Sequence, residues 1–270
     1  MSYDPKKVIA VATAEIGYLE KKDKTSLDDK TANAGSKNYT KYARDLDALG
    51  FYNGKKQGVA WCDVFVDWCF VQAYGLEAAL KLTNQPLGKN NCGAGCKYSR
   101  NYYKNKKRLF DTSPQPGDQI FFWPKDEIGG PTVAHTGLVY AVDETYVYTI
   151  EGNTSGANGV VANGGGVCKK KYKLTYNRIA GYGRPEYGMT VTDEPEKQEQ
   201  TNKWAKTVTI HAGSGGSVNI RKGNGTNYGR ITTVKSGAKF EYVATAENGW
   251  NAIVYDKQVA WVSGKYSAVT

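Results

Sequence analysis

The chain has 270 residues, 40% hydrophobic and 23% charged, and carries 36 Lys and Arg against 26 Asp and Glu, a net charge of +10. Its length suits two domains. With no apolar run near the ~20 residues that span a bilayer, the composition excludes a membrane-spanning protein. The N-terminal segment also lacks the continuous apolar core of a secretory signal, so we expect synthesis in the cytosol.

The positive charge lies in both predicted domains and not in the segment between them. Residues 1–188 carry 26 basic and 19 acidic side chains, and residues 203–270 carry nine and three, whereas the segment between is acidic. A basic surface favours nucleic acid, anionic lipid or anionic cell-wall polymers, although it also serves solubility alone. Five cysteines cannot all pair, and in a chain without an export signal we predict free thiols.

The first third of the chain predicts helices. Asp4 and Pro5 suit a helix cap and first turn, and an apolar stripe at helical spacing continues to Gly17. A second stripe covers residues 39–49. A third helix begins at Cys62, because apolar side chains recur three and four residues apart after it. These side chains are Cys62, Phe65, Val66, Cys69, Phe70 and Ala73.

From residue 114 the pattern becomes that of β-strands. A Pro-Gly turn leads into the apolar run 119–123, and runs 134–142 and 146–151 are separated by a three-residue turn, which predicts a hairpin. Two further runs, 169–176 and 179–183, add strands. Helices followed by antiparallel strands predict an α+β domain, its N-terminal helices packed on the sheet.

The last third predicts a linker and a second domain. Residues 189–204 are polar and have almost no apolar side chains to bury. Short β-rich runs between glycine turns follow, from residue 208 to residue 262, and they predict a small all-β barrel. We therefore divide the chain into a domain at 1–188, a linker at 189–204 and a barrel at 205–270.

Cys62 is the candidate nucleophile. The partial positive charge at a helix N-terminus lowers the pKa of a thiol, and thiolates are the reactive form. Of the other cysteines, Cys69 is expected in the core, Cys92 and Cys96 bracket a glycine-rich turn, and Cys168 lies among lysines. Buried cysteine is commonly structural, so the surrounding residues must support the catalytic interpretation.

The predicted hairpin supplies a base for this nucleophile. The chain has two histidines, and His211 belongs to the barrel, so His135 is the candidate. A turn centred between residues 143 and 144 places position 135 opposite 152, flanked by Glu151 and Asn153. Either side chain is within cross-strand reach of the imidazole, which satisfies the logic of a nucleophile, a base and an orienting group.

Four motifs in this order resemble those of the CHAP family, the cysteine- and histidine-dependent amidohydrolases/peptidases of bacteria and their phages. They are Trp61–Trp68 (WCDVFVDW), Pro116–Phe122 (PGDQIFF), Ala134–Val139 (AHTGLV) and Glu151–Ser155 (EGNTS). The resemblance covers about residues 5–187. It implies a papain-like fold that cleaves amide bonds in peptidoglycan, with Cys62 as nucleophile and His135 as base. Glu151 and Asn153 would orient the imidazole.

The resemblance also implies an oxyanion site and raises the question of a metal. The Cys62 backbone N–H would stabilise the oxyanion, with Gln57 as a candidate second donor. Some family members bind calcium through an Asp-rich loop before the cysteine, but here residues 52–58 contain two lysines. A site built from Asp23, Asp28 and Asp29 is an alternative to a solvated loop. We predict that catalysis needs neither a metal nor another cofactor.

Residues 207–266 resemble a bacterial SH3-type domain, which implies cell-wall binding. The aromatic residues of this domain would either line a groove or fill the barrel core. These candidates are Tyr228, Tyr242, Trp250 and Trp261. A catalytic domain joined to a wall-binding module, with no signal sequence, is similar to a phage or prophage endolysin, held in the cytosol until released to the wall.

Several functions remain open from the sequence. The predicted one is a Gram-positive peptidoglycan hydrolase, either an N-acetylmuramoyl-L-alanine amidase or a peptidoglycan endopeptidase, because both need the same chemistry. The alternatives are a cysteine protease acting on proteins and a non-catalytic wall-binding protein. A nucleic-acid-binding function has only the net charge in its favour. We expect peptidoglycan as the partner, with anionic wall polymers as a further ligand and neither nucleic acid nor membrane insertion.

Overall fold

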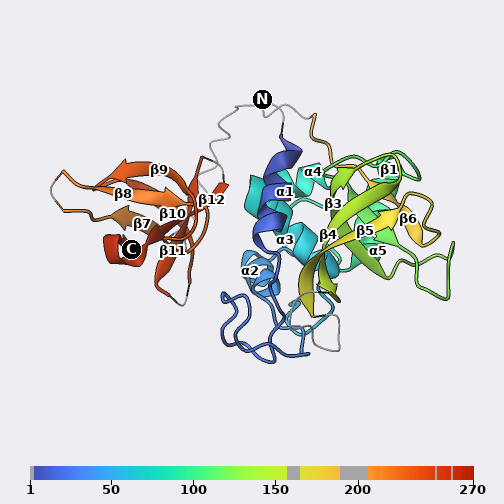
Figure 1. Ribbon diagram of the computed structural model, residues 1–270, viewed down its shortest axis with the longest axis horizontal. Helices are drawn as coiled ribbons and strands as arrows, with labels where there is room; N and C mark the ends of the chain where they lie inside the picture. Colours follow the sequence, from blue (N-terminus) through green and yellow to red (C-terminus); the bar gives the residue numbers. More distant parts are fainter. Residues whose placement is uncertain (1–2, 157–164, 189–205, 214, 247, 257) are drawn as a thin grey trace. The chain divides into compact units, whose positions relative to one another are not determined.

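The computed structural model describes residues 3–156, 165–188, 206–213, 215–246, 248–256 and 258–270 (Figure 1). The chain divides into two compact units, Met1–Val191 and Thr192–Thr270. The predicted linker at 189–204 falls outside the described residues. No described helix is both long enough and apolar enough to cross a membrane.

Helices in the described part of the first unit form where caps and apolar spacing favour them. Their bounds are α1 Pro5–Ala14, α2 Lys41–Leu49, α3 Cys62–Tyr74, α4 Leu76–Leu82 and α5 Cys96–Asn105. The Asp4 carboxylate accepts a hydrogen bond from the Lys6 amide and the Thr40 hydroxyl accepts one from Ala43, which are the expected N-cap contacts. Gly50 ends α2 in the left-handed conformation, with φ of 63°.

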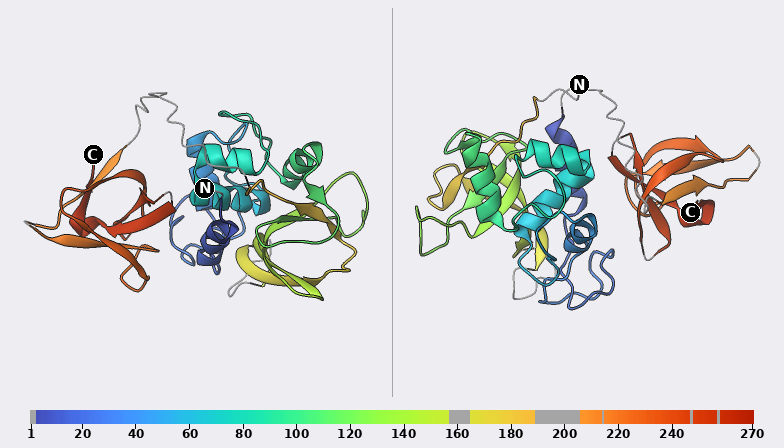
Figure 2. Two further views of the ribbon diagram at one scale, coloured as in Figure 1. Left: turned by 90° about the horizontal axis from the view of Figure 1, so that it is seen from above. Right: turned by 180° about the vertical axis from the view of Figure 1, so that it is seen from behind.

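Helix α3 lies at the centre of the first unit. Every side chain from Cys62 to Ala73 is buried, so the predicted single apolar face is wrong. The reason is that α1, α2 and α4 pack on α3 as well as the strands (Figure 2). Two carboxylates on this helix, Asp63 and Asp67, are therefore buried with the apolar side chains.

The sheet of the first unit is antiparallel, with the strand order β1-β6-β2-β3-β4-β5. Its strands are β1 Leu109–Phe110, β2 Gln119–Phe122, β3 His135–Val142, β4 Tyr146–Thr154, β5 Gly166–Lys173 and β6 Ile179–Gly183. Strands β3 and β4 pack against α3, which brings the predicted hairpin to the predicted catalytic helix. The α+β class is confirmed.

The β3–β4 register differs by one residue from the prediction. Leu138 pairs with Ile150, where the predicted turn centre required residue 149. The strands meet at Val142 and Val147, and a bulge between Val139 and Ala141 absorbs one residue. His135 and Glu151 still share a face as diagonal neighbours, because strand side chains alternate with a period of two.

The second unit is all β in its described residues, as predicted, apart from one 3₁₀ turn at Gly264–Tyr266. Its sheet has the order β13-β7-β10-β11-β12-β8-β9. The strands are β7 Thr207–Ile210, β8 Ser217–Arg221, β9 Arg230–Lys235, β10 Lys239–Thr245, β11 Trp250–Tyr255, β12 Gln258–Ser263 and β13 Ser267–Val269. Aliphatic side chains such as Val208, Ile253 and Val262 form its core.

Candidate active site

Cys62 is the first residue of α3, as predicted. Its neighbour Trp61 is the N-cap and offers no side-chain acceptor to the first turn of the helix, whereas the Cys62 sulfur accepts from the Asp63 amide. The Trp61 indole instead donates to the buried Glu20 carboxylate at 2.8 Å, which fixes the chain just before the nucleophile. Cys62 itself is 6% exposed. The thiol therefore lies at the positive end of a buried helix.

His135 begins strand β3 and lies beside the Cys62 thiol. Its Nε2 atom is 2.9 Å from Oε2 of Glu151, on the neighbouring strand β4. Because Nε2 is occupied by the carboxylate, Nδ1 is the nitrogen that can exchange a proton with the thiol. The side chain of His135 is 21% exposed, whereas that of Glu151 is fully buried. The three predicted groups are thus assembled in the order nucleophile, base and orienting carboxylate.

The Glu151 carboxylate has two further hydrogen-bond donors. The Thr149 hydroxyl donates to Oε1 at 2.5 Å, and the Tyr172 hydroxyl donates to Oε2 at 3.2 Å. Space for the side chain comes from Gly137, where an added Cβ would lie 2.5 Å from Cγ of Glu151. The residue opposite Glu151 is therefore a glycine for a steric reason.

Asn153 lies two residues beyond Glu151 and has a left-handed backbone, with φ of 53°. Its side-chain oxygen Oδ1 is buried without a hydrogen-bond partner among the described residues. In the same part of the chain, no hydrogen bond joins it to His135, whose Nε2 is taken by Glu151. A role for Asn153 in orienting the imidazole stays a prediction.

The sequence did not indicate that Cys96 lies beside Cys62. Cys96 is the first residue of α5, and Asp63 joins the two helix starts by accepting from the Gly95 amide at 3.1 Å and the Ser99 hydroxyl at 2.9 Å. The Cys96 sulfur also lies 3.4 Å from the Val133 carbonyl oxygen, a second acceptor that competes with Cys62 for the single thiol proton. The buried residues of α5, Cys96, Ser99 and Tyr103, recur at helical spacing, but such spacing does not indicate which helix they contact.

The electrostatics of the site favour a thiolate and an imidazolium. Hydrogen bonding from Cys96 lowers the pKa of Cys62 well below its ordinary value, and interaction with His135 lowers it further against the effect of burial. Burial lowers the pKa of His135, but its hydrogen bonds to Cys62 and Glu151 outweigh burial and raise that pKa to about 10. The pKa of Cys96 is raised by the same contact with Cys62 and by burial, so Cys96 stays a thiol donor.

Gln57, the predicted second oxyanion donor, is held elsewhere. Its Nε2 donates to the Thr40 carbonyl at 2.7 Å, and its Oε1 accepts from the Thr40 amide at 3.1 Å. This pair of bonds anchors the loop before α3 to the start of α2. An oxyanion role for Gln57 stays a prediction, as does the role of the Cys62 backbone N–H.

The acidic residues considered for calcium have separate roles. Asp23 accepts from Thr25 and Asn33, Asp28 forms a bidentate pair with Arg44, and Asp29 accepts from backbone amides. Within the described ranges, no three His, Cys, Asp or Glu side chains are placed to share a metal ion. The absence of a metal requirement stays a prediction.

The aromatic candidates of the second unit divide into two kinds. Tyr242 packs against the core cluster, which favours the predicted core position over a position in a binding groove. Trp250 and Trp261 are half-buried, and the pairing of Trp261 with Ala252 places both on the face of β11 and β12 opposite the core residue Ile253. Tyr228 is also half-buried and lies outside that core cluster.

Comparison with known families identifies both units. The model of the CHAP domain matches residues 54–153, which include Cys62, His135 and Glu151. Residues 54–153 of this chain therefore form a CHAP domain. The model of the bacterial SH3 domain matches residues 216–268. The CHAP domain thus contains the assembled site, and the bacterial SH3 domain contains the two tryptophans that share one face of the sheet.

Two curated relatives match part of this chain. The probable endopeptidase p60 of Listeria monocytogenes serovar 1/2a is 32% identical over 99 residues, which is 36% of this chain and 18% of the relative. That of Listeria seeligeri is 31% identical over 105 residues, covering 38% and 17%. The matched segment therefore spans less than a fifth of each relative.

Solved structures give weaker similarity. The crystal structure of Ly7917 with the hydrolyzing product of MDP aligns over 98% of both chains at 12% identity and a TM-score of 0.42. A second Ly7917 structure aligns over 98% of this chain and 97% of that chain, at 14% identity and a TM-score of 0.40.

Proposed function

We propose that this protein is a cysteine-dependent peptidoglycan hydrolase. The observation that carries the proposal is the buried Cys62–His135–Glu151 arrangement, in which the pKa of the thiol is lowered and that of the imidazole is raised. The match to the CHAP domain and to two relatives named as probable endopeptidases supports hydrolysis of an amide bond.

The chemistry follows from the positions of these groups. The Cys62 thiolate attacks the amide carbonyl, and the Cys62 backbone N–H, free of an intrahelical acceptor in the first turn, donates to the developing oxyanion. His135 then protonates the leaving amine from Nδ1 while Glu151 holds Nε2. Water, deprotonated by His135, hydrolyses the thioester and restores the thiolate. Glu151 stabilises the imidazolium in both steps.

Binding to the wall is assigned to the bacterial SH3 domain. Its family match supports this, and so do the half-buried Trp250 and Trp261 on one face of the sheet. Trp261→Ala should weaken pull-down by purified Gram-positive walls while cleavage of a soluble muropeptide is retained. An excess of basic over acidic side chains in residues 203–270 supports a contribution from anionic wall polymers, which would make binding weaker at high salt.

The decisive experiment is clearing of purified Gram-positive cell walls. Cys62→Ala should abolish clearing and keep wall binding, and the matched control Cys92→Ala should clear at the wild-type rate. Cys92 is also a buried thiol, but burial raises its pKa, whereas a nucleophilic thiol needs a lowered pKa. Undiminished clearing by Cys62→Ala would refute the proposal. Cleavage of denatured protein without wall clearing would favour the alternative of a protein-directed cysteine protease.

Among the two bond specificities we favour the endopeptidase, because the curated relatives are named as such. Mass spectrometry of digested walls distinguishes the two. An endopeptidase exposes new amino groups within the stem or bridge peptides, whereas an amidase frees the N-terminus of the whole stem peptide. Release of intact stem peptides would therefore assign amidase activity.

We further propose that the protein serves as an endolysin. The combination of a CHAP domain with a bacterial SH3 domain supports this role. Expression in a susceptible host should lyse cells only when a membrane-permeabilising protein is supplied with it. Lysis by the protein alone would argue against a dependence on release.

A further inference from the structure

The Glu151 carboxylate is bonded more extensively than a pair with His135 requires. It is fully buried, and each of its oxygens accepts a hydroxyl donor: Thr149 bonds to Oε1 and Tyr172 bonds to Oε2. Oε2 is also the oxygen that is hydrogen-bonded to Nε2 of His135, at 2.9 Å. A carboxylate fixed at both oxygens cannot rotate about its terminal torsion without breaking a hydrogen bond.

Tyr172 reaches this carboxylate from strand β5, which lies beyond the catalytic hairpin. Its ring centroid is 4.7 Å from that of Phe122, and Phe122 in turn stacks on the His135 imidazole at 5.9 Å. Tyr172 also stacks on Tyr176, at 5.4 Å with an interplanar angle of 16°. The phenol is therefore packed against two rings, and its hydroxyl donates to Glu151.

The hydroxyl acts as a donor across the working pH range. Burial raises the pKa of Tyr172, and the neighbouring negative charge of Glu151 raises it further. A phenol that keeps its proton can donate to a carboxylate but cannot act as a base. Tyr172 therefore stabilises the ionised Glu151 without taking part in proton transfer.

We propose that Tyr172 is a positioning residue of this active site: its hydroxyl fixes the Glu151 carboxylate, which in turn fixes the His135 imidazole for exchange with Cys62. The proposal rests on the proposed hydrolase function for its kinetic consequence. The geometry itself is independent of the substrate, because Tyr172 contacts the orienting carboxylate and not the reacting sulfur.

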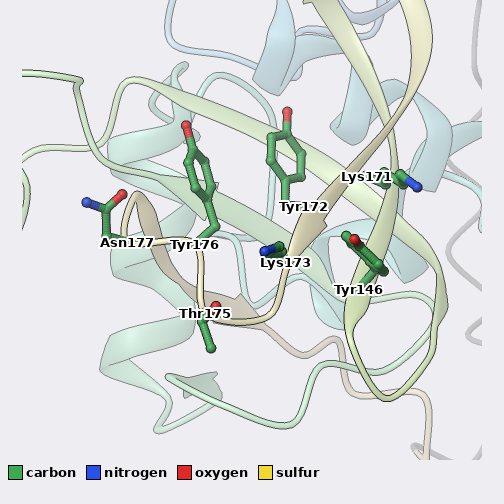
Figure 3. A pocket seen from close by; sticks show the side chains of 7 residues that line it. All are labelled: Tyr146, Lys171, Tyr172, Lys173, Thr175, Tyr176 and Asn177. Atoms are coloured by element: carbon green, nitrogen blue, oxygen red, sulfur yellow. The ribbon is translucent and has the colours of Figure 1, made fainter.

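Tyr172 is also accessible from outside the catalytic centre. Its ring lines an open hollow with Tyr146, Lys171, Lys173, Thr175, Tyr176 and Asn177 (Figure 3). The figure shows the Tyr172 and Tyr176 rings side by side, projecting in the same direction. Tyr176 therefore provides a matched control, since its hydroxyl has no hydrogen-bond partner among the residues that the structure describes.

The test compares Tyr172→Phe with Tyr176→Phe, each of which removes one hydroxyl and keeps the ring. For Tyr172→Phe we expect kcat on a soluble muropeptide to fall about tenfold, as for a lost hydrogen bond to a charged group, with KM within about twofold. The alkaline limb of kcat/KM should move to lower pH, because a less well-held Glu151 stabilises the imidazolium less. Tyr176→Phe should match the wild type in all three values.

A second measurement needs no substrate. The rate of Cys62 alkylation by iodoacetamide, followed by peptide mass spectrometry across pH, reports the thiolate–imidazolium pair directly. Tyr172→Phe should change the alkaline part of this profile in the same direction as the kinetics. The melting temperature of each variant shows that the fold is kept.

The outcomes separate the two proposals. If the wild type cleaves no wall material but the alkylation profile responds to Tyr172→Phe, the hydrolase function fails and the positioning role stands. If wall cleavage is robust and Tyr172→Phe keeps the wild-type kcat and profile, Tyr172 is only structural. If the alkaline limb of kcat/KM moved to higher pH in Tyr172→Phe while kcat stayed at the wild-type value, the Tyr172 hydroxyl would only weaken the electrostatic effect of Glu151 on His135. That result would also overturn the proposal.

Discussion

Glu151→Gln removes the negative charge that faces the base while keeping nearly the same shape. The pKa of His135 rises from its ordinary 6.5 to about 10 through contacts with Cys62 and Glu151. This rise corresponds to about 5 kcal/mol in favour of the imidazolium. If Glu151 supplies about half, its neutralisation costs roughly 2–3 kcal/mol and moves the pKa of His135 down by about two units.

The alkaline limb of kcat/KM reports this change. For the wild type we expect activity to persist to a pH near the His135 pKa, and for Glu151→Gln we expect the limb about two pH units lower. At neutral pH kcat should fall at least about tenfold, because the transition state also carries an imidazolium. Glu144→Gln, which neutralises an exposed carboxylate in the turn of the same hairpin, is the control and should leave both values unchanged.

An unchanged limb in Glu151→Gln would refute the reasoning, provided that the variant melts within a few degrees of the wild type. It would mean that the thiolate of Cys62 alone holds the proton on His135. A variant that lost activity with the limb in place would assign Glu151 an orienting role without an electrostatic one.

Three further predictions concern residues around this pair. Cys96→Ala removes the thiol that hydrogen-bonds to Cys62, so the acid limb and the onset of Cys62 alkylation should move to higher pH. Gly137→Ala places a Cβ 2.5 Å from Cγ of Glu151, so at least about a tenfold loss of kcat with a lower melting temperature is expected. Burial raises the pKa of Asp67 to about 7, so its contribution to stability is present below pH 4 and lost as pH rises through 7. The melting temperature of Asp67→Asn should therefore change less between pH 4 and pH 7 than that of the wild type. The difference corresponds to at most about 4 kcal/mol in unfolding free energy, and a pH dependence as steep as that of the wild type would contradict this.

Local signals along the chain identified most elements and the three groups of the site. The sequence alone determined the features that depend on neighbouring residues. These are the caps at Asp4 and Gly50, the apolar spacing after Cys62 and the hairpin around residue 144. The hairpin also brought Glu151 to His135 despite the error of one residue in register, because diagonal neighbours on one face remain within reach.

Contacts between distant segments were decided only by the tertiary structure. Cys96 meets Cys62 because Asp63 joins the starts of two helices, and Tyr172 reaches Glu151 from the next strand of the sheet. Neither contact has a periodic signature, since each depends on how whole elements pack. The sequence therefore determined which groups carry the chemistry. Packing decided which neighbours set their charge and orientation, because the pKa of a buried group is determined by whatever surrounds it in space.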